Sequence, residues 1–296
     1  MADIREILQH IIKSNIILLR KAGFKNIDEN KYLMIILLAV IIPIVFKYVV
    51  HLNIRSVTLL IVVYVLSVLM IPKVIYELKI EEFERNLPKA LYVMVLSLES
   101  GRSIVDAIQE VVDSGIKEVD KVFLKIILLI KERKMSFEEA VYIVANSMDS
   151  YIFKLVGRLL IETRKYGGEL AETLRTLAKT LEDLQNLRSQ LLSVTANGLA
   201  VGLVILCGVV PATAGIIGGY LDIVSSLVPN APPVKPEEIA KCMEVVQIGT
   251  GIFGLLFTVP LFGLKASRMV IGCALCMTFG MLAFYVALNM TGILFQ

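Results

Sequence analysis

Long stretches without charged residues divide the chain into apolar and polar parts. Five of them reach about 20 residues, the length that an α-helix needs to cross a bilayer core of about 30 Å. They cover residues 32–50, 57–76, 191–221, 245–264 and 269–295. Lysines occur in the first two only toward their ends, where the side chains can reach the membrane interface. The sequence therefore predicts five transmembrane helices, grouped as 32–76, 191–221 and 245–296.

The segment 77–190 has a different pattern. With its flanking residues from 73 on, it holds 18 Lys or Arg and 19 Asp or Glu, whereas the other 178 residues share 12 and 8. Apolar residues recur at every third or fourth position, which is typical of amphipathic helices. A segment of this length is sufficient to bury a core of its own. We predict an all-α membrane protein with one inserted six-helix bundle.

Helix start and stop signals set the limits of the six helices. These are expected over residues 77–99, 103–114, 116–132, 136–147, 150–166 and 169–190. In the first helix, Pro88 predicts a kink or the opening of a second half. Ser103 is a predicted N-cap with Asp106 in the first turn, and Ser136 with Glu139 form a capping box.

The last of these helices is expected to continue into the membrane. No Pro or Gly occurs from Glu169 to Asn197, so one helix can run from the bundle into the third span. Its part before the span would be roughly 33 Å long at about 1.5 Å per residue. Leucines repeat along it, which indicates either a face buried in the bundle or a seam for dimerisation. They are Leu170, Leu174, Leu177, Leu181, Leu184, Leu187 and Leu191.

The distribution of Lys and Arg predicts the orientation of the spans. Residues 1–31 carry six of them, which favours a cytoplasmic amino terminus and argues against a cleaved signal peptide. Segment 77–190 is then cytoplasmic, and the loop 222–244 and the carboxyl terminus are external. Residues 4–19 are expected to form an amphipathic helix that lies either on the membrane surface or on the protein itself.

Composition narrows the classes of function. The residues AVILMFWYC make up 56 % of the chain and charged residues 19 %, and the mean hydropathy is +0.75, values that exclude an ordinary soluble enzyme. A formal net charge of +3 is too small for a protein built mainly to bind nucleic acid. The two His and four Cys are widely scattered, so no metal or cofactor is expected. Cys273 and Cys276 are expected to be buried thiols.

Two segments of the predicted bundle carry motifs of a known family. In LESGRSIVDAI (residues 98–108) a Gly, a small residue and an Ala end one helix and start the next. In ETRKYGGELAETLRTLAKTLEDLQNLRSQL (residues 162–191) a Glu precedes a Gly and a Leu that open the last helix. The motif residues are Gly101, Ser103, Ala107, Glu162, Gly168 and Leu170. With the flanking spans, the pattern over roughly residues 85–191 resembles the F domain of type II secretion systems. This family includes the platform proteins of type IV pili, the Tad pilus and the archaellum.

The resemblance implies a non-enzymatic platform in the cytoplasmic membrane, surrounded by lipid. Such a platform contacts a hexameric secretion ATPase from inside and helps to lift pilin-like subunits into a filament. The chain has no G-x-x-x-x-G-K-[ST] phosphate loop, so a partner must hydrolyse the ATP. Its single F domain resembles the short Tad-type and archaeal members, which implies a homodimer or a pairing with a second short platform subunit.

Three sets of residues are candidates for structural or partner roles. Gly101 and Gly168 are expected at helix ends with positive φ, so the motif residues are mainly architectural. Cations at helix ends either complement the helix dipole or meet acidic residues of the ATPase; they are Arg102, Lys131, Arg133, Lys134, Arg164 and Lys165. Glycines of the spans allow close helix packing within the protein, between protomers or against a pilin; they are Gly198, Gly202, Gly215, Gly219, Gly249, Gly251 and Gly254.

The main alternative is a small-solute transporter or channel. Such proteins usually carry ionisable groups in the middle of the membrane, and none of the five predicted spans has a charge at its centre. A membrane aspartyl peptidase would need paired Asp residues in the spans, and the spans contain none. The platform therefore remains the preferred function.

Overall fold

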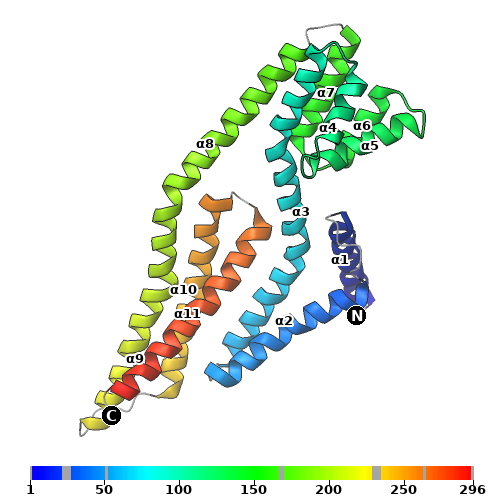
Figure 1. Cartoon of the computed structure of the whole chain (residues 1–296). Coiled ribbons are helices and arrows are strands. Elements are labelled where there is room, and N and C mark those ends of the chain that lie inside the picture. The colour runs from blue at the N-terminus through cyan, green and yellow to red at the C-terminus, as the bar shows by residue number, and fades with distance from the viewer. Residues whose placement is uncertain are drawn as a thin grey trace. The chain divides into compact units, whose positions relative to one another are not determined.

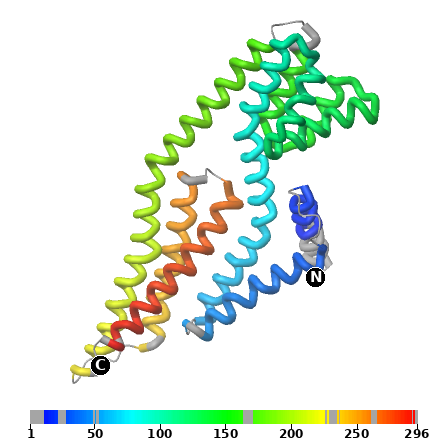
Figure 2. Tube along the Cα trace, in the orientation of Figure 1, coloured from blue at the N-terminus to red at the C-terminus, as the bar shows by residue number. Residues whose placement is uncertain are grey.

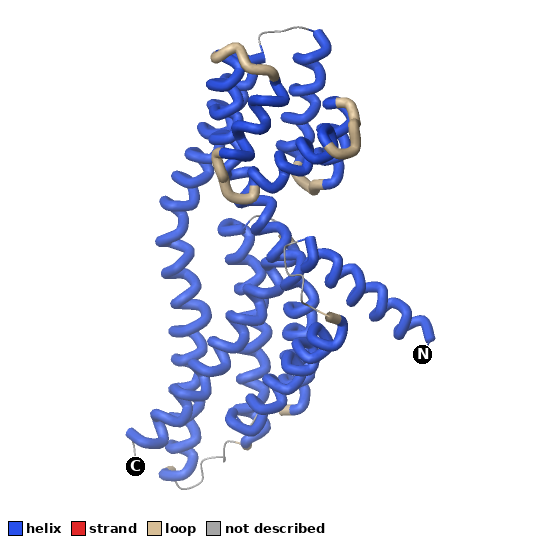
Figure 3. The backbone as a smooth tube through the Cα atoms, turned by 45° about the vertical axis from the view of Figure 1, so that its right-hand side comes forward, coloured by secondary structure: helices blue, strands red, loops and turns tan. Residues whose placement is uncertain are grey.

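The structure is a computed structural model that describes residues 2–21, 28–50, 53–166, 170–228, 235–262 and 265–294. Within these residues every regular element is a helix and no strand occurs (Figure 3), which confirms the predicted all-α fold. The helices are α1 (Ala2–Lys21), α2 (Glu29–Val50), α3 (Ile54–Glu99), α4 (Ile104–Asp113), α5 (Val119–Lys131), α6 (Phe137–Ser147), α7 (Tyr151–Tyr166), α8 (Leu170–Val204), the π-helix η1 (Ile205–Val209), α9 (Val210–Leu227), α10 (Pro236–Phe262) and α11 (Ala266–Leu294) (Figure 1).

The chain divides into two compact units. One consists of Glu77–Leu191, here called the helical domain, and the other of Met1–Tyr76 with Leu192–Gln296, here called the membrane unit. Helices α3 and α8 cross the limits between these ranges without a break, so each contributes residues to both units.

Five helical segments are long and apolar enough to cross a membrane, which confirms the predicted number of spans. They are Glu29–Tyr48, Ile54–Glu99, Ala171–Ser225, Glu237–Pro260 and Ala266–Thr291. The second predicted span, which ends at residue 76, and the first predicted bundle helix, which begins at residue 77, belong to one helix, α3. The predicted continuity of the last bundle helix with the third span is confirmed by α8.

Other helix limits also differ from the prediction. Helix α5 begins at Val119, three residues later than expected, because Glu118 adopts a left-handed conformation with φ of 62°. The predicted loop 222–244 is shorter, since α9 continues to Leu227 and α10 begins at Pro236. Proline suits the first turn of a helix, where its missing N–H has no intrahelical partner.

Helix α3 passes Pro88 because another helix replaces the missing hydrogen bond. A proline has no N–H, so the carbonyl four residues earlier, that of Glu84, loses its helical donor. Gln185 of α8 donates a hydrogen bond from Nε2 to this carbonyl over 2.9 Å. The same glutamate accepts a hydrogen bond at Oε1 from the Ser150 hydroxyl, 2.6 Å away. Ser150 is fully buried and also accepts a hydrogen bond from the Phe153 N–H at the start of α7.

Pro72 in the membrane part of α3 has a similar arrangement. The carbonyl of Val68 accepts a hydrogen bond from the Tyr32 hydroxyl of α2 over 3.3 Å. Asn15 of α1 donates to the Tyr32 oxygen and to the Leu69 carbonyl, each over 3.0 Å. Asn15 and Tyr32 are buried. The second half of α1 therefore packs on the protein itself, one of the two placements that the sequence leaves open.

One cluster of apolar side chains forms the core of the helical domain and includes residues from α3 to α8. Phe83 of α3 meets Phe153 of α7 edge to face, with ring centroids 5.0 Å apart. Phe123 of α5 lies 5.9 Å from Phe153. Burial of each such side chain contributes about 1.5–3 kcal/mol. These rings pack α3, α5 and α7 against one another.

Candidate partner-binding surfaces

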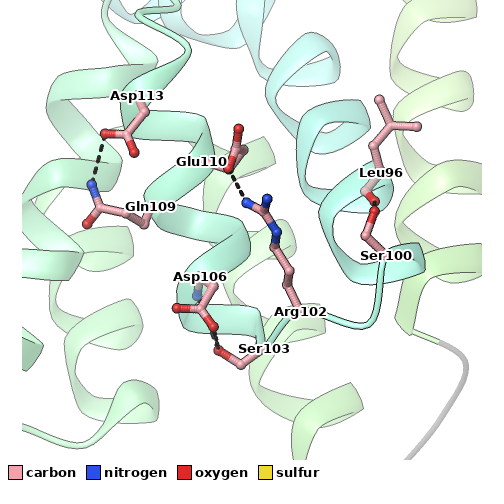
Figure 4. A network of polar contacts seen from close by, with 8 residues as sticks. All are labelled: Leu96, Ser100, Arg102, Ser103, Asp106, Gln109, Glu110 and Asp113. Carbon is pink, nitrogen blue, oxygen red and sulfur yellow. Dashed lines mark hydrogen bonds and ion pairs between the residues drawn. The ribbon is translucent and has the colours of Figure 1, made fainter.

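The first motif forms the turn between α3 and α4 (Figure 4). Gly101 follows the end of α3 with φ of 80°, a left-handed conformation that glycine adopts without steric cost. Ser103 is the N-cap of α4, as the sequence predicts, and its hydroxyl oxygen accepts the Asp106 N–H over 3.3 Å. Ala107 is fully buried in the core. All three motif residues therefore have a structural role in this turn.

The second motif lies partly outside the described residues. Gly168 is outside them, and the side chains of Arg164, Lys165 and Leu170 are not described either. Glu162 lies near the end of α7 and is exposed. The expected positive φ of Gly168 thus stays a prediction.

Two of the predicted cations contact α4. Arg102 forms an ion pair with Glu110 (Figure 4), and Lys131 Nζ donates a hydrogen bond to Gln109 Oε1 over 3.1 Å. Gln109 in turn donates from Nε2 to Asp113 Oδ1 over 3.0 Å. Exposed pairs of this kind contribute no more than about 1 kcal/mol. Both cations therefore have partners within the domain, which favours a local role for them.

The next two predicted cations have no such partner. Arg133 and Lys134 follow the end of α5 and are exposed. Among the described residues, no hydrogen bond or ion pair engages either side chain. Lys134 has φ of 52°, and the Met135 N–H donates to the Leu129 carbonyl over 3.3 Å. This turn closes α5 and leaves two adjacent positive charges available to a partner.

Glu118 connects α3 with the turn before α5, a role that the sequence did not predict. Its carboxylate lies 3.2 Å from Lys79 Nζ and 2.6 Å from Lys121 Nζ. Burial raises the pKa of Glu118, but hydrogen bonds from Lys121 and Lys79 outweigh it and hold the pKa below its ordinary value. The hydrogen bond between Lys121 and Glu118 also raises the pKa of Lys121. No local signal in the sequence connects Lys79 with residues about 40 positions later.

An open groove of ≈ 540 Å³ lies between α7 and α8. It is lined by Leu155, Leu159, Glu172, Thr173, Thr176, Leu177 and Thr180. Its lining holds one carboxylate among leucines and threonines, so it suits an apolar peptide surface better than a charged small molecule.

In the described part of the chain, no three His, Cys, Asp or Glu residues gather in a way that could hold a metal ion.

The leucine repeat of α8 divides between two environments. Leu174 and Leu181 are buried in the core, which confirms the first of the two alternatives for this part of the helix. Leu177 lines the groove. Leu177 also packs partly against the core. Leu184, Leu187 and Leu191 are 58 %, 57 % and 70 % exposed, so these three leucines lie outside the core of the domain.

Comparison with known proteins decides the family. The family model described as "Type II secretion system (T2SS), protein F" matches residues 90–218. An uncharacterized protein of Methanocaldococcus jannaschii is 50 % identical over 281 residues, which is 94 % of this chain and 94 % of that protein. The chain belongs to the type II secretion system protein F family. No solved structure matches it significantly.

The match to the protein F family includes part of the membrane unit. It extends through the rest of α8 and η1 into α9, beyond the roughly residues 85–191 of the sequence resemblance. In this region η1 ends at Val209, two residues before Pro211. A π-helical turn often marks a point where a helix accommodates an irregularity. The matched range thus covers most of the helical domain and the part of the third span that contains η1.

Most of the predicted packing glycines of this protein F family member lie against other helices of the membrane unit. A Cβ atom at Gly202 would collide with Phe257 of α10. Helices α9, α10 and α11 lie side by side (Figure 2), and a Cβ atom at four further glycines would collide with α11. These are Gly215, Gly219, Gly251 and Gly254. Gly198 and Gly249 have no atom within 4 Å of such a Cβ. Packing within the protein therefore explains five of the seven.

Cys273 and Cys276 lie on α11, and Gly254 packs against them. Both thiols are buried and neither is part of a disulfide. The prediction of small buried thiols is confirmed.

Proposed function

We propose that this chain is the membrane platform of a machine that assembles type IV pilus-like filaments or a related secretion filament. It would couple a cytoplasmic hexameric secretion ATPase to the insertion of pilin-like subunits, without catalysing a reaction itself. Members of its family work in general with secretion ATPases and pilins. The observation that carries the proposal is that α3 and α8 each run unbroken from the helical domain into a membrane span.

An unbroken helix suits this role for a physical reason. Its backbone hydrogen bonds connect each turn to the next, so a displacement at one end is transmitted along the axis with little internal motion. The Gln185 bond to the Glu84 carbonyl connects α8 with α3 at the turn that Pro88 would weaken. A force on the domain would therefore act on both helices together.

The proposal places the helical domain in the cytoplasm, on the side of the positive amino-terminal segment. The test is a single cysteine in place of Asp120, in a variant whose exposed native Cys242 is replaced by serine. A membrane-impermeant maleimide should label this cysteine only after the cells are permeabilised. Labelling in intact cells would overturn the proposed orientation, and with it the access of a cytoplasmic ATPase to the domain.

The ATPase contact is assigned to Arg133 and Lys134, because these exposed cations have no partner among the described residues. The experiment is capture of the full-length protein, in detergent, by the secretion ATPase of the same organism. The Arg133→Glu/Lys134→Glu variant should lose at least about tenfold in affinity, since two attractive charges become repulsive. The control is Lys117→Glu/Lys125→Glu, which makes the same change of charge at other exposed positions. Equal binding by both variants would contradict this contact.

A further inference from the structure

One face of α8 has leucines at heptad spacing; it begins at Leu177, which packs partly against the domain core, and leaves the core from Leu184 on. Leu177, Thr180, Leu184, Leu187 and Leu191 follow one another at alternating steps of three and four residues; they are here called the α8 seam. Leu184 and Leu187 are more than half exposed, whereas Leu174 and Leu181, on a neighbouring face of the same helix, are buried. This spacing is the signature of a helix that packs along a second helix.

The groove between α7 and α8 adjoins the first residues of this seam. Leu177 and Thr180 of the seam line the groove together with Leu155 and Leu159 of α7. Leu155 is 48 % exposed. A contiguous apolar face on a domain that is otherwise rich in charge indicates an interaction site. The face combines side chains from α7 and α8.

The charges beside the seam are complementary to those of a second, parallel copy. With Leu184 at heptad position a and Leu187 at d, Asp183 takes position g and Arg188 takes position e. In a parallel pair of helices, position g lies beside position e of the other helix five residues later. Asp183 would therefore meet Arg188 of the second copy, and twofold symmetry would repeat the pair. Both residues are exposed, and neither has a hydrogen bond or ion pair among the residues that the structure describes.

An antiparallel pairing would be unfavourable. It would bring position g beside position g and position e beside position e, so that Asp183 would face Asp183 and Arg188 would face Arg188. Copies of one membrane protein insert with the same orientation, and α8 continues into a span, so their α8 helices run in the same direction. The membrane thus imposes the parallel arrangement that the charges favour.

The heptad register continues beyond the helical domain. Val194 and Gly198 take the next d and a positions along the same helix. Val194 is 83 % exposed, and a Cβ atom at Gly198 would have no neighbour within 4 Å. A small residue at a seam position lets two helices approach closely in lipid. The seam therefore extends from the groove to the first turns of the span.

We propose that two copies of this chain dimerise along the α8 seam as a parallel coiled coil that continues into the bilayer. The heptad positions of α8, its direction in the membrane and the charges of Asp183 and Arg188 all match those of a second copy. A second copy therefore fits this face better than an unrelated segment does. The proposal does not depend on the platform function, because it concerns only the contact between two copies.

The test uses disulfide trapping of the full-length protein in its own membranes. The background is Cys242→Ser, because Cys242 is the exposed native cysteine and the other three are buried. Leu187→Cys should form a dimer under mild oxidation, since equivalent d positions face each other across a parallel seam. Asn186→Cys, also exposed and on another face of α8, is the matched control and should stay monomeric. Equal trapping of both variants, or a Leu187→Cys disulfide only with a different subunit, would overturn the proposal.

A charge exchange tests the pairing by a second route. Asp183→Arg and Arg188→Asp should each weaken dimerisation of the purified protein by about tenfold, since both symmetric pairs become repulsive. The double variant Asp183→Arg/Arg188→Asp should recover to within about threefold of the original affinity. These positions are exposed, so all three variants should fold. A double variant as weak as either single one would contradict the g-to-e pairing.

Discussion

At the scale of single residues, a few backbone and side-chain positions hold the turns of the helical domain. Gly101 ends α3 with a left-handed conformation, and Lys134 ends α5 in the same region without being glycine. Glu118 adopts it as well and is held there by two lysines. Each of these residues lies in the turn between two helices of the domain. Changes at Gly101 and Glu118, which belong to no proposed contact, should therefore alter stability and leave partner binding unchanged.

Gly101→Ala should lower the stability of the domain by about 1–2 kcal/mol, because a side chain is disfavoured at positive φ. No steric term is expected, since no atom lies within 4 Å of the added Cβ. The control is Gly249→Ala, which is helical and equally open, and should be neutral or slightly stabilising. Thermal unfolding of the full-length protein, followed by circular dichroism, measures both. A Gly101→Ala protein as stable as the control would contradict the assignment.

Glu118 predicts a pH dependence with a defined sign. Its pKa is lower in the folded protein than in the unfolded chain, so its stabilising contribution is full above the ordinary pKa of about 4.3 and is lost as the pH falls through the lowered value. Glu118→Gln should therefore cost about 0.5–1 kcal/mol at neutral pH and progressively less in acid. Denaturation midpoints measured across this range test the prediction. A difference that grows on acidification would have the wrong sign.

At the scale of helices, the domain depends on contacts between elements that are distant in sequence. The carbonyl of Glu84 lies one turn before Pro88 and has no donor within α3. Its donor, Gln185, lies 101 residues further along the chain. An unsatisfied carbonyl at a half-buried position costs about 1–3 kcal/mol. Gln185 thus enables α3 to remain one helix where a proline would otherwise favour a break.

Gln185→Leu should lower stability by about 1–3 kcal/mol, because the Glu84 carbonyl loses its donor. In the Pro88→Ala background the N–H of the introduced alanine can supply that hydrogen bond, so the same change should cost at least about 1 kcal/mol less. The four proteins form a double-mutant cycle measured by thermal unfolding. Gln190→Leu, at an exposed position of the same helix, is the control. Strictly additive effects would show that Gln185 does not act through the proline.

The same residues explain what the sequence could predict. Ser103 and Ser136 act within three residues of their partners, so local pattern predicted both caps. The spans were equally predictable, since their signal is a gap in charge. The continuity of α3 was missed because its support at Pro88 and Pro72 comes from Gln185, Tyr32 and Asn15 on other helices. The groove was missed for the same reason, as it needs two helices placed side by side.

At the scale of the whole molecule, the protein combines a charged helical domain with an apolar membrane unit. The two share α3 and α8, and the match to the protein F family extends across the second of these limits to residue 218. Under the proposed function, work done on the domain would reach the spans through these two helices. An interruption of α8 between the two should therefore separate ATPase binding from filament assembly.

The most direct measurement compares Ser189→Pro with Ser189→Ala in cells that lack the original protein. Ser189 is exposed and lies outside the α8 seam, and a proline within a helix costs about 3 kcal/mol and bends or breaks it. Both variants should reach the membrane at equal levels and bind the ATPase equally. Filaments should assemble with Ser189→Ala and fail to assemble with Ser189→Pro. Normal filaments with Ser189→Pro would contradict the transmission of force through an unbroken α8.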